Sequence, residues 1–467
     1  MAVLRRATGP EPRIPVLIIG AGACGMTAAL AAHDAGAEVL VLERDAVPSG
    51  STALSSGFIP ACGTRWQHAA GVDDGIDRML ADVQAKNHGQ GDAALGRAVC
   101  AASGPALEWL ADAHGQAFVL LTDFLYPGHA VHRMHAHPAK TGEALIGSLG
   151  AAVERAAIDL VCEAAVRDLI ADDAGRVLGV VIERPDGSTD EIGCEALVLA
   201  CNGYGGNPEM VRQHIPEMAD ALYFGHTGNR GDAVAWGVEL GGVARHMGAY
   251  QGHGSVAHPH GVLVTWALMM EGGVQVNAEG RRFSNEHEGY SEQSVKVLAQ
   301  PGGIAWNLYD ARLHAMGLGF EDYRRANDAG AIRQVGSVDA LATMIGCDAT
   351  VLSATIDHAR NCADGRARDS FGRDFTGAPA LAGPPFVAVR VTGALFHTQG
   401  GLAIDGNARV LRADGTALPN LYAGGGAAVG LSGTGVEGYL SGNGLLTAVS
   451  LGRLAGRAAA EQVGGRS

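Results

Sequence analysis

Two tyrosines stand where the backbone gains nothing from a phenol. Tyr439 lies in a glycine loop, GVEGYLSGNG, directly ahead of a helical pattern, and Tyr290 follows the polar stretch GRRFSNEHEG. A phenol beside a ketone can donate a hydrogen bond that strengthens as the oxygen gains negative charge. A second phenol can exchange a proton with the neighbouring carbon, although its ordinary pKa near 10 must be perturbed for that role. The two tyrosines are therefore candidates for hydrogen-bond donation or proton exchange, although either could also be an ordinary loop tyrosine.

The elements that would position these phenols begin with a nucleotide-binding fingerprint. The strand pattern VLII meets Gly20, Gly22 and Gly25 in G-x-G-x-x-G spacing, and an alanine-rich helical pattern and a second strand come next, ending at Glu43. The glycines let the backbone approach a pyrophosphate at the helix N-terminus, and Glu43 can accept a hydrogen bond from a ribose hydroxyl. The complete β-α-β context predicts a dinucleotide site.

The segments after the fingerprint indicate the kind of dinucleotide. A nicotinamide enzyme usually continues with further β-α-β units, whereas this chain continues with a Ser/Gly/Thr loop at 48–63. A hairpin-like pair of strands at 164–187 and two strands that end in glycines, at 195–210 and 419–430, come much later. One nucleotide fold assembled from distant pieces is typical of flavin enzymes.

Length and composition exclude several classes of protein. At 467 residues the chain predicts two domains, and a formal net charge of −15 argues against nucleic acid or an anionic membrane as a partner. The eight cysteines form no C-x-x-C pair, which predicts reduced, mostly buried thiols. No stretch approaches the ~20 apolar residues of a membrane span, and no signal-peptide pattern is present, so we expect a cytoplasmic protein.

The ordered motifs IIGAGACG, GSTALSSGF, ALVLACNG, HTGNRGDAV, GRRFSNE, HTQGGLAID, LYAGGG and YLSGNGL resemble the flavoprotein superfamily of soluble fumarate reductases and 3-ketosteroid dehydrogenases. The resemblance spans about 14–462 and implies an α/β fold. A Rossmann-like FAD-binding domain, 1–241 and 389–467, would be interrupted by a smaller α+β capping, or catalytic, domain at 242–388. It also implies non-covalent FAD, because the loop at 49–57 lacks the histidine that carries a covalent flavin in membrane-bound relatives.

The resemblance assigns a set of residues to the cofactor. The helix after Tyr439 would direct its N-terminus at the pyrimidine edge of the flavin, where it stabilises the anionic reduced ring. The residues expected to bind FAD are Gly20, Gly22, Ala23, Cys24, Gly25, Glu43, Arg44, Ser49, Gly50, Ser51, Thr52, Ser55, Ser56, Gly57, Val166, Ala200, Asn202, Gly203, Asp232, Gly425, Gly426, Asn443, Gly444 and Leu445.

The substrate positions separate the two branches of the superfamily. Fumarate reductases carry arginines at two positions that are Tyr290 and Tyr439 here, and a proton-relay Glu and Arg at positions that are Trp266 and Met269. A dicarboxylate would find no opposite charge at these four positions, and burying it unpaired is prohibitive. Ketosteroid dehydrogenases instead carry tyrosines at both positions, and the Δ4-(5α) type has a serine two residues after the second tyrosine, which is Ser441 here.

Other candidate residues have a structural interpretation beside a functional one. His253 and His397 match histidines that line the active site of fumarate reductases, although lone histidines are more often structural. Ser441 would contact the ketone or cap the helix after it, and Tyr126 would be a third active-site phenol. The segment 129–140 holds four histidines whose spacing fits no zinc pattern, so we expect no metal there and interpret it as a polar loop covering the adenine side.

Together these patterns favour an FAD-dependent dehydrogenase that desaturates a cyclic ketone, either a 3-ketosteroid or a smaller oxocyclohexane-type compound. Hydride would pass to flavin N5 and the proton to Tyr290, while Tyr439 polarises the ketone. An enone, urocanate-like or fumarate-type reductase is the first alternative, because the same residues serve both directions. A non-enzymatic flavin electron-transfer protein is the second. With only one dinucleotide fingerprint, the electrons would be exchanged with an external quinone or carrier protein.

Overall fold

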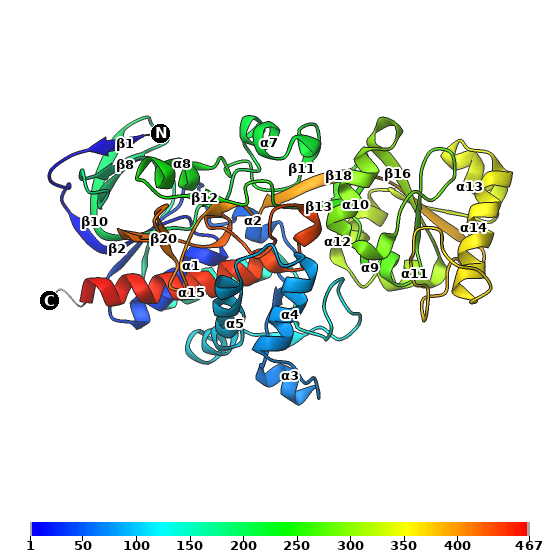
Figure 1. Ribbon diagram of the computed structural model, residues 1–467, viewed down its shortest axis with the longest axis horizontal. Helices are drawn as coiled ribbons and strands as arrows, with labels where there is room; N and C mark the ends of the chain where they lie inside the picture. The colour runs from blue at the N-terminus through cyan, green and yellow to red at the C-terminus, as the bar shows by residue number, and fades with distance from the viewer. Residues whose placement is uncertain (1, 465–467) are drawn as a thin grey trace. The chain divides into compact units, whose positions relative to one another are not determined.

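The computed structural model describes residues 2–464, which form two compact units (Figure 1). The first unit contains the chain up to Pro216, then Phe224–Tyr250, and then the chain from His397 onward. The second unit contains Glu217–Tyr223 and Gln251–Phe396. The insertion expected at 242–388 overlaps this second unit, whose main segment starts and ends later. The α/β class expected from the sequence is confirmed.

The first unit is built on a nine-stranded sheet in the order β1-β8-β9-β10-β2-β3-β7, with β21 beside β10 and β20 beside β21. Its strands are β1 (Val3–Arg5), β2 (Arg13–Ile19), β3 (Val39–Leu42), β7 (Asp159–Val161), β8 (Ala165–Ala171), β9 (Val177–Glu183), β10 (Thr189–Leu199), β20 (Arg409–Leu411) and β21 (Ala417–Ala423). The central strands β10, β2, β3 and β7 are parallel. The apolar runs of β10, β2 and β3 are buried, as expected for parallel strands covered on both faces.

Strand β10 joins segments that are far apart in the sequence. Its first half pairs antiparallel with β9, and its second half pairs parallel with β21, Leu199 lying opposite Ala423. Strands β8 and β9 form the antiparallel pair predicted for 164–187. The sequence-distant pieces of the expected flavin fold are thus neighbours in one sheet.

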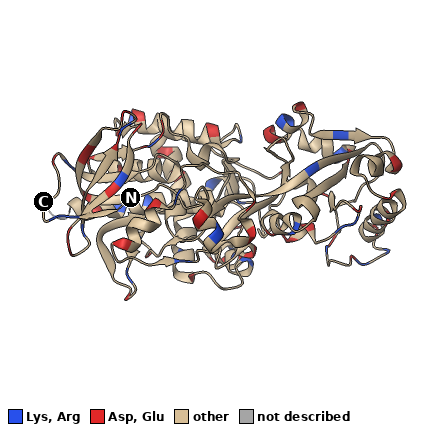
Figure 2. Ribbon diagram, turned by 90° about the horizontal axis from the view of Figure 1, so that it is seen from above, with Lys and Arg blue, Asp and Glu red and all other residues tan. Residues whose placement is uncertain are grey.

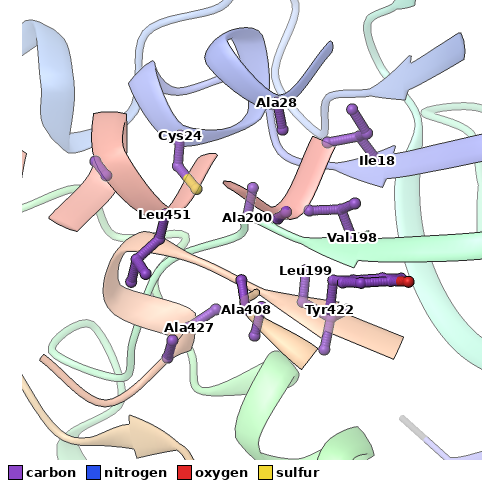
Figure 3. Packing of buried hydrophobic residues seen from close by; sticks show 14 of the residues in the cluster. Ile18, Cys24, Ala28, Val198, Leu199, Ala200, Ala408, Tyr422, Ala427 and Leu451 are labelled. Carbon is purple, nitrogen blue, oxygen red and sulfur yellow. The ribbon is translucent and has the colours of Figure 1, made fainter. Parts of the chain in front are cut away.

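Two helices carry the functional loops of this unit, and they pack against each other. Helix α1 (Ala23–Asp34) follows β2, and helix α15 (Asn443–Gly464) lies along α1 (Figure 1). Figure 3 shows Cys24 of α1 and Leu451 of α15 in the same buried cluster as Val198 and Ala200. The two backbones touch, since a Cβ on Gly456 would lie 2.1 Å from the carbonyl oxygen of Ala28.

The other elements of the first unit surround this framework. They are α2 (Gly50–Ala53), β4 (Ile59–Pro60), α3 (Arg65–Ala69), α4 (Ile76–Lys86), α5 (Ala93–His114), β5 (Val119–Leu120), β6 (Met134–Ala136), α6 (Gly142–Arg155), α7 (Pro208–His214), α8 (Asp232–Glu239), β12 (Ala244–Arg245) and β19 (Gly401–Leu402). Strands β5, β6 and β4 form a small antiparallel sheet of their own.

The second unit contains a seven-stranded sheet in the order β14-β13-β18-β16-β15, with β11 and β17 also paired to β18. Its strands are β11 (Leu222–Tyr223), β13 (Tyr250–Ala257), β14 (Val262–Leu263), β15 (Val274–Val276), β16 (Ile304–Asp310), β17 (Ile332–Val335) and β18 (Phe386–Thr398). Its helices are α9 (Ala267–Met270), α10 (Tyr290–Leu298), α11 (Ala311–Gly317), α12 (Glu321–Asp328), α13 (Val338–Ile345) and α14 (Ala349–Ala363). Helices α13 and α14 cover β15 and β16 through a separate apolar core.

Surface charge is mixed in both units. Figure 2 shows acidic and basic residues interspersed along the chain. Within residues 2–464, no single helix is long and apolar enough to cross a membrane, and only α13 and α14 together, bent by 117°, reach that length and composition. The eight cysteines are free, and Cys24, Cys62, Cys100 and Cys194 are buried.

Candidate active site

The glycine turn between β2 and α1 has the close backbone packing that the fingerprint predicts. Gly20 has φ +103°, and a Cβ on Gly25 would lie 1.8 Å from the Gly20 carbonyl oxygen. Gly22 differs, because its φ of −77° suits any residue and a Cβ there would meet only Thr52 Oγ1, at 3.5 Å. Gly22 precedes α1 without a side-chain cap. The protein fold therefore demands glycine at 20 and 25 but leaves the space over Gly22 open.

The acidic end of β3 is buried beside this turn. Glu43 is 8% exposed, and its carboxylate accepts hydrogen bonds from the backbone N–H groups of Ala21 (2.8 Å) and Asp45 (3.1 Å). The neighbouring Arg44 donates to the Gly228 carbonyl at 2.5 Å and pairs with Asp232 at 3.3 Å. Burial raises the pKa of Asp232, against the opposing charge of Arg44. One oxygen of Asp232, Oδ1, is buried and has no hydrogen-bond partner in the described chain.

The Ser/Gly/Thr loop packs its hydroxyl groups against neighbouring segments. Thr52 Oγ1 accepts from the N–H of Ala23 at 3.1 Å, which ties the loop to the start of α1. Ser51 Oγ accepts from Asn229 Nδ2 at 2.9 Å. Gly50 lies inside α2. The loop is therefore ordered beside the glycine turn, as a contribution to the same nucleotide site requires.

Two more glycine turns come after β10 and β21, whose parallel C-terminal ends lie side by side. Asn202 has φ +66°, and its Oδ1 lies 2.1 Å from where a Cβ on Gly426 would stand. A Cβ on Gly203 would lie 2.0 Å from Thr398 Oγ1. Ligands of open α/β sheets bind at the C-terminal ends of such strands. The structure thus brings the predicted 200–203 and 425–426 segments together with the β2–α1 turn.

The start of α15 contains an unsatisfied polar side chain. Asn443 is fully buried, and within the described residues neither atom of its amide has a hydrogen-bond partner. Buried amides are rarely left unpaired, so this group points to a missing polar ligand. Next to it, a Cβ on Gly444 would lie 2.7 Å from His397 Nε2.

These features fit FAD. The uncapped start of α1 suits a pyrophosphate, the buried carboxylate of Glu43 suits a ribose, and the unpaired amide of Asn443 suits a polar ring edge. The predicted cofactor residues between Gly20 and Leu445 all belong to the first unit.

The candidate catalytic residues of the first unit are Tyr439, His397, Ser441 and Tyr126. Tyr439 is 5% exposed and its ring meets that of His397 edge-on, with centroids 5.6 Å apart. Burial lowers the pKa of His397 to about 4, so this imidazole is neutral at ordinary pH. Ser441 donates to the Pro127 carbonyl at 3.4 Å and lies two residues before α15 begins, so its hydroxyl bonds another segment and not an amide of that helix. Tyr126 packs on Phe124, centroids 4.2 Å apart, in a small aromatic cluster.

The candidate residues of the second unit form an aromatic stack. Tyr290 is the first residue of α10, and its ring lies parallel to His253, which in turn stacks on Phe396 at 5.3 Å. Trp266 meets His253 edge-on at 5.9 Å. His253 Nδ1 accepts from the N–H of Ser255 at 3.1 Å, so the proton of the neutral ring is on Nε2. Burial lowers the pKa of His253 to about 3, which makes it a poor base and a neutral hydrogen-bond donor.

A buried ionic network that the sequence analysis missed supports this stack. Arg282 makes two hydrogen bonds to the Glu286 carboxylate, at 2.9 and 2.6 Å, and Arg373 reaches the same carboxylate at 3.1 Å. Arg373 also donates to the Met269 carbonyl at 2.6 Å, and Trp266 donates to the Glu286 carbonyl at 3.2 Å. Burial alone would raise the pKa of Glu286, but the two arginines outweigh it and hold that pKa low. The motif GRRFSNE contains Arg282 and Glu286 four residues apart, and this spacing of opposite charges could have predicted their ion pair.

The histidines at 129–140 point in different directions. His129 bonds Ser441 and Arg133, and His135 bonds Thr64 Oγ1 at 2.8 Å. The structure packs His129 against the Ser441 loop, and the expected cover of the adenine side by this segment stays a prediction. Elsewhere in the described chain, ligand atoms of His358, Cys362 and Asp369 lie within 4.8 Å of one another. Asp369 is already ion-paired with Arg282.

Comparison with known proteins identifies the class. Residues 15–445 match the family described as FAD binding domain. The chain is 30% identical to a probable fumarate reductase, Ifc3, of Shewanella frigidimarina over 97% of this chain and 76% of that protein. It is 28% identical to a urocanate reductase of Eggerthella lenta over 91% and 71%, respectively. It is 26% identical to a 4-oxocyclohexanecarboxylate 2-dehydrogenase of Sinomonas cyclohexanicum over 98% and 94%.

Solved structures agree. The open conformation of a flavocytochrome c3 fumarate reductase superposes with a TM-score of 0.81 at 29% identity, covering 97% of this chain and 79% of that one. A 3-ketosteroid-Δ4-(5α)-dehydrogenase from Rhodococcus jostii has the same fold, with a TM-score of 0.77 at 24% identity over 98% of this chain and 99% of that one.

The chain belongs to the FAD binding domain family of flavoproteins, and it is similar over most of its length to fumarate reductases. It is an FAD-dependent oxidoreductase that acts on CH–CH groups.

Proposed function

We propose that this enzyme reduces the conjugated C=C bond of an α,β-unsaturated ketone, with a cyclic enone as the substrate class. The names of its similar relatives support reduction over the desaturation that the sequence first favoured, since two of the three relatives compared are reductases. The absence of charge at Trp266, Met269, Tyr290 and Tyr439 supports a ketone over a dicarboxylate. Tyrosines at both positions where fumarate reductases carry arginines are the observation that carries the proposal.

The chemistry divides between the cofactor and two phenols. Bound reduced FAD would supply a hydride to the β-carbon. Tyr439 donates a hydrogen bond to the carbonyl oxygen, and this bond strengthens as the oxygen becomes enolate-like. Tyr290 gives its proton to the α-carbon, which completes the addition of two hydrogens across the double bond. Burial lowers the pKa of His253 to about 3, so little imidazolium is present near neutral pH, which favours Tyr290 over His253 as the acid.

The same groups serve the reverse reaction by microscopic reversibility. Tyr290 would then accept the α-proton while a hydride leaves the β-carbon for the oxidised cofactor. The likeness to a 4-oxocyclohexanecarboxylate 2-dehydrogenase, which covers nearly the whole of both chains, favours this as the second candidate. We also propose that FAD is held non-covalently, because the loop at 49–57 offers no histidine.

The direct test is anaerobic stopped-flow with dithionite-reduced enzyme. A panel of a 2-cyclohexenone, an oxocyclohexene carboxylate, a 4-ene-3-ketosteroid, urocanate and fumarate is mixed in, and the return of oxidised flavin is followed. At least one cyclic enone should reoxidise the flavin at a rate on the order of 10 per second. Fast reoxidation by fumarate or urocanate alone would overturn the proposal. Oxidised enzyme mixed with the saturated ketones measures the reverse direction.

Matched variants separate the phenols from general effects on folding. Tyr290→Phe and Tyr439→Phe should slow reoxidation, whereas Tyr309→Phe and Tyr422→Phe should not. Tyr309 is a buried phenol of the second unit that bonds Tyr323 at 2.8 Å, and Tyr422 is one of the first unit that bonds Gln462 at 2.6 Å. If all four variants behave alike, the chain is better described as a flavin electron-transfer protein.

A further inference from the structure

The segment after Tyr126 contacts the loop that carries Tyr439, although the segment and the loop are far apart in the sequence. His129 Nε2 lies 2.9 Å from the Ser441 carbonyl oxygen, a pair separated by 312 residues. The Ser441 hydroxyl donates back to Pro127 at 3.4 Å. Between these contacts Gly128, at φ +81°, approaches so closely that a Cβ would lie 2.6 Å from Leu440 Cδ1. Three consecutive residues of one segment therefore contact two consecutive residues of the other.

The segment is itself anchored by a buried arginine. Arg133 is 1% exposed and bonds both oxygens of Asp74, each at 2.9 Å, and one oxygen of Asp82 at 2.5 Å. The N–H of Ala130 also donates to Asp82, at 2.8 Å. A buried guanidinium with two carboxylate partners is held firmly, since each partner is costly to leave unpaired. The guanidinium of Arg133 also donates to His129 Nδ1, at 3.1 Å.

The two contacts of His129 fix its protonation state. A guanidinium can only donate, so Nδ1 must carry a lone pair, and a carbonyl oxygen can only accept, so Nε2 must carry the proton. One neutral tautomer satisfies both demands, whereas an imidazolium would turn an Nδ1–H toward the arginine. Burial and the charge of Arg133 lower the pKa of His129 to about 4, in agreement with a neutral ring.

The loop that His129 holds has a specific need for such an anchor. Tyr439 follows Gly438, and Gly442 lies just beyond Ser441 with φ +84°. Glycines increase the freedom of a loop, so its single conformation must be imposed by contacts outside it. A phenol that stabilises a transition state must be held closely in place, since a displacement of about 1 Å can cost on the order of a hundredfold in rate.

We infer that His129 is a positioning residue, which orients Tyr439 by holding the Ser441 carbonyl against the Arg133 anchor. The catalytic part of this inference rests on the proposed role of Tyr439. The structural part, that His129 orders the loop, stands without it.

Hydrogen–deuterium exchange tests the structural part without any substrate. FAD-loaded wild type is compared with His129→Leu, which removes both contacts, and with His137→Leu as the control. His137 belongs to the same segment, and its Nδ1 accepts a local hydrogen bond from the N–H of Ala139 at 3.1 Å. Peptides spanning 436–446 should exchange at least several-fold faster in His129→Leu and at the wild-type rate in His137→Leu. Equal exchange in all three proteins overturns the inference.

A double-mutant cycle tests the catalytic part. With an enone that reoxidises the wild-type flavin, His129→Leu should lower the saturating rate of flavin reoxidation by about tenfold to a hundredfold. In the Tyr439→Phe background the same change should cost less than about twofold, because residues that act through one another are not additive. Multiplying effects would overturn the catalytic part. His129→Gln, which keeps an N–H for the Ser441 carbonyl, should recover part of the rate.

The outcomes stay distinct from failure of the proposed function. If no enone oxidises the reduced wild type, the proposed function fails, and the exchange experiment still decides the role of His129. If His129→Leu does not fold, Asp82→Asn takes its place, because it weakens the Arg133 anchor while retaining the histidine. Faster exchange at 436–446 in that variant supports the anchor, and unchanged exchange opposes it.

Discussion

The rings of His253 and Tyr290 lie almost parallel, with centroids 4.8 Å apart and 20° between their planes. A stack of this kind fixes the plane of the tyrosine, and His253 is fixed in turn by Phe396 behind it and by the N–H of Ser255. Such restraint is what a proton donor aimed at one carbon atom requires.

Tyr290→Phe should keep this stack and lose the proton. We expect an unchanged thermal midpoint, with flavin reoxidation by an enone slowed about a hundred- to ten-thousand-fold. In deuterated buffer, wild type should place deuterium at the α-carbon of the product, as mass spectrometry will show. A variant that reacts and labels as fast as wild type would assign the acid to another group.

Gly22 and Gly25 should fail for different reasons when substituted. A Cβ on Gly25 would strike the Gly20 carbonyl at 1.8 Å, so Gly25→Ala should destabilise the apo-protein itself. A Cβ on Gly22 meets only Thr52 Oγ1 at 3.5 Å, so Gly22→Val should fold normally and bind FAD poorly, because the side chain occupies the pyrophosphate position. Apo-protein melting and FAD titration measure the two effects separately. Tight FAD binding by Gly22→Val would contradict this placement of the pyrophosphate.

Acid should destabilise the protein through its buried histidines. The pKa values of His129 and His135 are lowered to about 4 and that of His253 to about 3, chiefly by burial, from an ordinary 6.5. Between these values the unfolded chain binds more protons than the folded one, so stability falls as the pH drops below 6.5. Each of these histidines lowers the free energy of unfolding by about 1.4 kcal/mol for each pH unit below that range's upper end.

Urea unfolding of FAD-saturated protein at pH 7 and pH 5 measures this slope. His135→Gln should flatten it by one group's share. A slope that His135→Gln does not alter would mean that His135 is not held neutral in the fold.

Fumarate should be a poor substrate. The four positions that the resemblance to fumarate reductases assigns to the dicarboxylate are Trp266, Met269, Tyr290 and Tyr439, none of which is charged. An unpaired buried charge costs several kcal/mol. We expect kcat/KM for fumarate to be at least about a hundredfold below that of the best enone, measured with dithionite-reduced enzyme. Comparable values would show that other cations of the chain serve the dicarboxylate.

The parts of this fold that can be predicted from the sequence are those determined by residues close together along the chain. The strand–glycine–helix unit at 16–34 and the hairpin at 164–187 depend on neighbours a few residues away. The contact of His129 with Ser441 spans 312 residues, and no local pattern encodes it. The hydrogen bond from Arg373 to Glu286 joins residues 87 positions apart, so no local pattern encodes it either.

The interpretation of Ser441 as a helix cap failed for the same reason. A serine ahead of a helix is a natural cap, but α15 begins two residues later and the hydroxyl finds Pro127 instead. The sequence showed a good local partner for the side chain, and the tertiary structure supplied a different one.

The pairing of β21 with β10 also affects the order in which the two units can complete their folds during synthesis. When the ribosome has made the chain through Phe396, the second unit has all its residues, whereas β10 still lacks its neighbour and α1 lacks the helix that covers it. The edge at Leu197–Leu199 is apolar and has unpaired backbone groups until Leu421–Ala423 emerges. The first unit is therefore completed last. Throughout synthesis of the second unit, the nascent protein exposes an unpaired, aggregation-prone strand edge.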